Sequence, residues 1–243
     1  MATPAQGGPA AAAESERLHP ALDVFFSPAA TMDALARRPR FLVALLISTI
    51  IGTITVSIAF QRGVIEQFLR QKIEASPRME QLPADQRERG IEQSARFFSF
   101  FYIAVAVVGP TIGLLLTSGV LLLLTKLVGG VGATFRQMMG VVAHAWLPHS
   151  LSGLIAIPIL LAKEAEAVDF QNMVPMANLS FLFTPSEQHK AYLFASSIDL
   201  FSFWVIWLLV LGLARLTSKG KGAVLPIVLI PWALFVCFKV IFG

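Results

Sequence analysis

Residues 97–128 read FFSFFYIAVAVVGPTIGLLLTSGVLLLLTKLV and hold a single charged side chain, Lys126. The hydrocarbon core of a bilayer is about 30 Å thick, and about 20 residues of α-helix cross it. This stretch is therefore longer than one straight crossing requires, and Gly109-Pro110 near its middle predicts a kink. Runs such as Leu121–Leu124 do not alternate with polar residues, which argues against the strands of a membrane β-barrel.

Four further stretches are apolar and long enough to cross a bilayer: 41–60, 138–162, 192–217 and 222–242. Of the 243 residues, 56% are hydrophobic and 14% are charged, whereas soluble domains carry about 25% charged residues. The mean hydropathy is +0.70. Lipid offers no hydrogen bonds to an open backbone, so these segments are expected to be helices. The sequence thus predicts an all-α polytopic membrane protein, a five-helix transmembrane bundle.

The chain divides into a short tail and one membrane domain. Residues 1–21 are rich in Ala, Gly and Pro and are expected to be disordered. Residues 22–243 are predicted to form a single five-span domain. Between the first two spans, residues 61–96 show two helical patterns separated by Pro77 and Pro83. We therefore expect a helical hairpin that extends out of the membrane.

An amphipathic helix is predicted just ahead of the first span. Met32 and Leu35 fall on one face at helical spacing. Arg37, Arg38 and Arg40 follow, at the entrance to the membrane. We expect this helix to lie in the membrane interface, with the three arginines as a basic anchor. A solvated linker is the alternative.

The links between spans differ in charge. The second and fourth links are flanked by Lys126, Arg136, Arg215, Lys219 and Lys221, whereas the third holds Glu164, Glu166, Asp169 and Glu187. The positive-inside rule then places the N-terminus in the cytoplasm and the C-terminus outside. The first link is rich in arginine, but it is long and nearly neutral and is discounted. Most of the formal charge of +4 lies beside the spans. We therefore interpret these basic residues as determinants of membrane orientation, and no nucleic-acid partner is expected.

Asp199 is the sharpest candidate for a functional residue, because it falls within the predicted fourth span. A charge in hydrocarbon costs several kcal/mol on insertion scales, so this side chain must face the bundle and find a partner or a proton. Two interpretations stay open: an ion or proton site, or a structural clamp bonded to another helix. The structural clamp is preferred.

His144 and His149, both in the predicted third span, are the other candidates for a polar intramembrane site. Five residues apart, they lie roughly 140° apart around a straight helix, so a shared site would need a kink at Pro148. The zinc-protease pattern His-Glu-x-x-His is absent. Nucleotide loops and nucleophile elbows are absent as well. We therefore expect no metal, no cofactor and no enzyme activity.

Short motifs occur in a fixed order: Phe26-Ser27-Pro28 before the first span, Thr134-Phe135-Arg136-Gln137 and Leu147-Pro148 at the third, and Ile198-Asp199-Leu200-Phe201 at the fourth. This set, over roughly residues 22–243, resembles the Yip domain family (Ypt-interacting proteins). The resemblance implies a five-helix membrane bundle with a cytoplasmic N-terminus. Eukaryotic members act in vesicle trafficking and bind small GTPases of the Rab type. This chain is more similar to the bacterial branch: the eukaryotic Asp-Leu-Tyr-Gly-Pro motif is absent, so small-GTPase binding is not expected.

These features predict a non-enzymatic integral membrane protein of a bacterial inner membrane, which acts as a scaffold or organiser of membrane proteins and lipids. The expected partners are the lipid bilayer, other membrane proteins and a second copy of the chain. The alternative is a small channel or transporter that uses a polar intramembrane site around Asp199.

Overall fold

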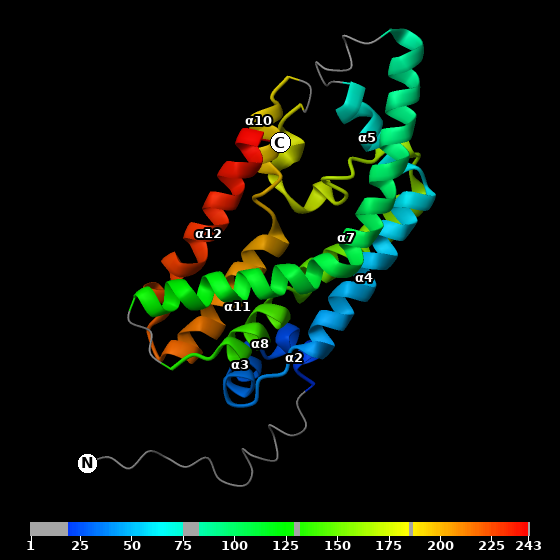
Figure 1. Ribbon diagram of the computed structural model, residues 1–243. Helices are drawn as coiled ribbons and strands as arrows, with labels where there is room; N and C mark the ends of the chain where they lie inside the picture. Colours follow the sequence, from blue (N-terminus) through cyan, green and yellow to red (C-terminus); the bar gives the residue numbers. More distant parts are fainter. Residues whose placement is uncertain (1–18, 75–82, 129–131, 185–186, 243) are drawn as a thin grey trace, which may run out of the picture.

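The computed structural model describes residues 19–74, 83–128, 132–184 and 187–242 (Figure 1). Within these ranges all regular elements are helical, which confirms the predicted fold class. The α-helices are α2 (Pro20–Phe26), α3 (Pro28–Arg37), α4 (Leu42–Gln61), α5 (Val64–Glu74), α7 (Ala84–Leu127), α8 (Phe135–Ala145), α9 (Leu147–Ala162), α10 (His189–Ala195), α11 (Leu200–Thr217) and α12 (Lys221–Phe242). Three short 3₁₀ helices, Ala165–Ala167, Pro175–Ala177 and Leu179–Leu182, lie between α9 and α10.

The described residues include five helical segments that are long and apolar enough to cross a membrane: Leu42–Gln61, Asp85–Leu127, Phe135–Ala162, Leu200–Thr217 and Lys221–Phe242. The 44 residues of α7 correspond to about 66 Å of helix, more than twice the hydrocarbon thickness. Figure 1 shows α7 changing direction part-way along its length, and Pro110 lies inside the helix. The N-terminal part of α7 packs with α5 at the end of the molecule opposite α2 and α3.

Helix α11 is the centre of the bundle. It packs against α3, α8, α9 and α12. Of the residues in its apolar stretch, 61% are buried inside the protein, compared with 17% for α4 and for α7. Its residues Leu208 and Leu213 are fully buried with Met138 of α8. A second apolar cluster joins α5 to α4, α7 and α9 around Ile65 and Leu160.

The predicted N-terminal helix is present as α3, and its apolar face is covered by protein. Met32 and Leu35 are fully buried where α3 packs on α8 and α11. Asp33 forms an ion pair with Arg215 of α11 at 3.2 Å, and Gln137 Nε2 donates to the carbonyl oxygen of Ala36 at 2.6 Å. The face that was expected to rest on lipid thus holds the N-terminal segment to the bundle.

Two predicted spans are interrupted. The third, predicted as 138–162, consists of α8 and α9 with Trp146 between them. Pro148 lies in the first turn of α9, where its missing N–H costs no helical hydrogen bond. The fourth, predicted as 192–217, is α10 followed by α11, with Ser196–Asp199 outside both helices.

Two other sequence predictions fall partly outside the described residues. The expected disordered tail, 1–21, lies there as far as residue 18, and Pro20 already begins helix α2. The expected turn of the hairpin, near Pro77 to Pro83, falls largely on residues 75–82, which are also outside the described ranges. The two arms of that hairpin, α5 and the start of α7, pack on each other.

Candidate functional site

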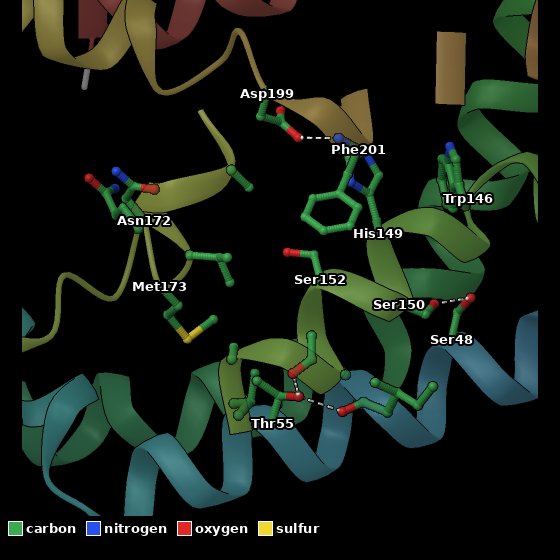
Figure 2. A pocket seen from close by; sticks show the side chains of 18 of the residues that line it. Ser48, Thr55, Trp146, His149, Ser150, Ser152, Asn172, Met173, Asp199 and Phe201 are labelled. Carbon is green, nitrogen blue, oxygen red and sulfur yellow. Dashed lines mark hydrogen bonds between the residues drawn. The ribbon is translucent and has the colours of Figure 1, made fainter. Parts of the chain in front are cut away.

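A cavity of about 480 Å³ lies between α4, α9 and the segment that precedes α11 (Figure 2). Its walls hold small and polar residues from both helices and from the link between α9 and α10. The small and polar lining residues include Ser48, Gly52, Thr55, His149, Ser152, Asn172 and Asp199. Its volume falls within the range of roughly 300–1,000 Å³ that is typical of ligand pockets.

Two hydrogen-bonded contacts close the wall between α4 and α9. Ser150 Oγ donates to Ser48 Oγ at 2.9 Å, and Thr55 Oγ1 approaches the carbonyl oxygen of Gly153 at 3.2 Å. A Cβ atom at Gly153 would lie 3.2 Å from Ile51 Cγ2. The glycine therefore allows the two helices to approach closely, as small residues do in membrane bundles.

The opposite wall is a folded loop held by side-chain hydrogen bonds. Asn172 Nδ2 donates to Ser180 Oγ at 2.7 Å and to the Tyr192 hydroxyl at 2.9 Å, and Asn178 Nδ2 donates to Asn172 Oδ1 at 2.7 Å. The Tyr192 hydroxyl donates to Asp169 Oδ2 at 2.6 Å. Burial, and then the bond to Asp169, raise the pKa of Tyr192 to about 12.

Asp199 lies on the cavity wall, but its place in the chain differs from the sequence prediction. It is the N-cap residue of α11 and not a residue two turns inside a span. Its Oδ1 accepts hydrogen bonds from the backbone N–H groups of Phe201 and Ser202, both at 2.9 Å, and its Oδ2 accepts from Ser202 Oγ. The carboxylate thereby satisfies N–H groups that a helix leaves unpaired at its start.

The structure brings Asp199 and His149 to the same cavity and leaves His144 elsewhere. His149 lines the cavity beside Phe201 (Figure 2). His144 is buried within α8, where its Nδ1 lies 2.8 Å from the carbonyl oxygen of Gly140. Within the described ranges, His, Cys, Asp and Glu side chains form no group of three or more that could hold a metal ion.

Lys239 of α12 contacts the break between α10 and α11. Its Nζ donates to Ser196 Oγ at 2.8 Å and to Ser197 Oγ at 3.2 Å. The ammonium group near the end of α12 therefore binds another part of the bundle, next to the cavity wall at Ser196.

Sequence reasoning missed the small polar residues of the cavity. Ser48, Gly52 and Thr55 recur at spacings of four and three, which places them on one face of α4. Ser152 of α9 points into the cavity (Figure 2). A polar stripe on an apolar helix was the available signal for this site.

The proposed basic anchor lies at the other end of the bundle, where α3 leads into α4. Arg37, Arg38 and Arg40 are exposed. Arg136 at the start of α8 and Lys221 at the start of α12 are exposed as well, and Figure 1 shows these helix ends on the same side of the molecule as α3.

A family model described as the Yip1 domain matches residues 22–242, nearly the whole chain. This match confirms the resemblance found in the ordered sequence motifs. Searches of curated proteins and of solved structures returned no match. Together with the five apolar helices, the family match identifies an integral membrane protein.

Proposed function

We propose that this chain, which belongs to the Yip1 domain family, is a non-enzymatic scaffold that organises membrane proteins and lipids. In this proposal residues 22–243 act as one five-span domain of a bacterial inner membrane, with a cytoplasmic N-terminus. Small GTPases are not among the proposed partners. The partners are lipids, other membrane proteins and a second copy of the chain.

The observation that carries this proposal is the uncovered apolar surface of the outer spans. Leu116 of α7 is 65% exposed, and Ile230 and Leu234 of α12 are exposed too. Among the five candidate spans of the described residues, α11 alone is mostly enclosed by the chain itself. In a bilayer these faces meet either lipid or the helices of neighbouring proteins, and Gly119 of α7, beside which a Cβ would meet nothing within 4 Å, leaves room for close helix contact.

The test is cysteine crosslinking in native membranes, starting from a Cys237→Ser background. Leu116→Cys places a thiol on the open face of α7, and Leu114→Cys, at a position 1% exposed, is the matched buried control. We expect Leu116→Cys to give reproducible adducts with the same neighbour, and Leu114→Cys to give none. Monomer without reproducible adducts at exposed positions along α4, α7 and α12 would contradict the scaffold role.

The second candidate function is a small channel or transporter, and the observation that favours it is the cavity shared by Asp199 and His149. Flux into proteoliposomes tests it, with wild type compared with Asp199→Asn. Asparagine can still cap α11 but carries no charge. Flux that depends on the charge would promote the carrier over the scaffold, and equal flux in empty vesicles would reject it.

The basic anchor is proposed to bind anionic headgroups through Arg37, Arg38 and Arg40. Basic residues near a cytoplasmic surface each contribute about 1 kcal/mol to attraction for anionic lipid. Replacing all three with glutamine is expected to weaken association of the purified protein with anionic lipid and to leave its association with zwitterionic lipid unchanged. If native mass spectrometry showed the same amount of bound anionic lipid for the variant and for wild type, the anchor would not have this role.

A further inference from the structure

We propose that the cavity between α4 and α9 binds one electrically neutral, hydroxyl-bearing amphiphile, such as an acylglycerol. This goes beyond the scaffold role, because the ligand is held inside the protein and not on its outer faces. It rests on the polar groups that the fold leaves free, on the charges that the fold satisfies and on the shape of the apolar wall.

Several polar side chains on the cavity wall form no side-chain hydrogen bond within the described part of the chain. They are Trp146, His149, Ser152 and Gln171. Of these, the imidazole of His149 and the hydroxyl of Ser152 can each donate and accept. His149 is exposed and Ser152 is half-buried, so water can satisfy both groups, and a ligand that displaces this water must offer equivalent hydrogen bonds. A ligand hydroxyl, which also donates and accepts, is the simplest complement.

The charged groups nearby do not require a counter-ion from the ligand. The carboxylate of Asp199 accepts from Phe201, Ser202 and the Ser202 hydroxyl. The ammonium of Lys239 donates to two serine hydroxyls. Since both charged groups already have hydrogen-bond partners inside the protein, an ionic headgroup would gain little and would lose its hydration on entry. A neutral head is therefore favoured.

Part of the wall is apolar and suits a hydrocarbon chain. Val56 of α4, Ala156 of α9 and Met173 of the folded loop line the cavity, and Met173 lies on the side of the cavity away from Trp146 (Figure 2). A polar end beside His149 and an apolar body toward Met173 would match both parts of the wall.

Photoaffinity labelling in lipid nanodiscs tests the proposal, with monolaurin that carries a diazirine on its acyl chain. We expect saturable labelling of peptides from α4 and α9. Excess unlabelled monolaurin should compete, whereas laurate and laurylamine, which have chains of the same length and charged heads, should compete at least about tenfold less well. Nanodiscs are used because maltoside detergents are themselves neutral amphiphiles with hydroxyl groups.

Glycine variants provide the matched control. A Cβ at Gly52, which lines the cavity, and one at Gly119, which lies outside it, would each meet nothing within 4 Å. Gly52→Leu should fill the cavity and reduce labelling at least about tenfold, while Gly119→Leu should label like wild type. Ser152→Ala should weaken binding about three- to tenfold, as expected for one neutral hydrogen bond.

The outcomes are decisive in either direction. Labelling that does not saturate, that persists in Gly52→Leu, or that laurate or laurylamine displaces as well as monolaurin does would overturn the proposal. If Gly52→Leu does not elute as folded protein, Ser152→Ala decides the question. None of these measurements involves a protein partner, so a failed scaffold test leaves this result standing.

Discussion

At the scale of single residues, Asp199 has a clear structural task at the start of α11. Its carboxylate accepts from two backbone N–H groups. We predict that Asp199→Ala lowers the free energy of unfolding by about 1 kcal/mol, because it removes the cap, whereas Asp199→Asn changes it by only a few tenths of that. Apparent melting temperatures in detergent, followed by circular dichroism, measure the difference. A loss as large for asparagine as for alanine would mean that the charge matters more than the cap.

Tyr192 provides a second test at this scale. Its pKa is raised to about 12, first by burial and then by the bond to Asp169, whereas an unfolded tyrosine titrates near pH 10. Between these values the folded state binds more protons than the unfolded state. The contribution of this group to stability is therefore full below about pH 10 and is lost as the pH rises to about 12.

The measurement uses Tyr102→Phe, since the chain holds two tyrosines and this variant leaves Tyr192 alone. Tyrosinate absorbance in the ultraviolet should give a midpoint near pH 12 in the folded protein. A midpoint near pH 10 without unfolding would show that the hydroxyl is not held between Asp169 and Asn172.

Asp199 stands out in the sequence as a charge in an apolar run, but its place as the N-cap of α11 could not be predicted. Residues 192–217 form one apolar run in which Ser196 and Ser197 are the only break before Asp199. The mean hydropathy of a long segment does not show where within that segment a helix begins. The structure identifies the N-cap, because α10 ends at Ala195 and the backbone of Asp199 is extended directly before α11.

At the scale of elements, α11 packs closely on α8 at Gly212. A Cβ built on Gly212 would overlap Cγ1 of Val141 and would lie 3.2 Å from Sδ of Met32 on α3. We predict that Gly212→Ala destabilises the protein by about 1–3 kcal/mol, because Val141 is buried and an overpacked core must shift. The measurement is thermal unfolding of the purified variant.

The matched control is Gly119→Ala in α7, where the added methyl group meets open space. Alanine is the better helix former by about 1 kcal/mol in water, so this variant should be as stable as wild type or slightly more so. Equal behaviour of Gly212→Ala and Gly119→Ala would show that α8 and α11 are not packed this closely.

The existence of the elements could be predicted better than their ends. Apolar length alone located the five spans, because a hydrocarbon layer imposes that length. Breaks within spans depend on single residues: Trp146 separates α8 from α9, and Pro148 lies in the first turn of α9. Whether a proline bends a helix, lies at the start of a new helix or is accommodated within one depends on the neighbouring helices. Pro158, for example, lies inside α9.

At the scale of the whole molecule, the cavity could not be predicted at all. Ser48 and Ser150 are 102 residues apart in sequence, and Lys239 reaches Ser196 across 43. One sequence carries the polar stripe on each helix but not the pairing of the helices. The pairing comes from tertiary packing around α11, and local sequence patterns do not show which distant helices come into contact.

The orientation of the molecule is the last property to test, and the ends of α11 allow it. Glu187 lies in the acidic link before α10, whereas Gly220 lies in the basic link after α11. We predict that, in a Cys237→Ser background, a membrane-impermeant maleimide labels Glu187→Cys in intact inner-membrane spheroplasts and labels Gly220→Cys only after permeabilisation. The reason is that the basic links are retained on the cytoplasmic side. The reverse pattern would invert the proposed topology, and labelling of both positions from one side would mean that α11 does not cross the membrane.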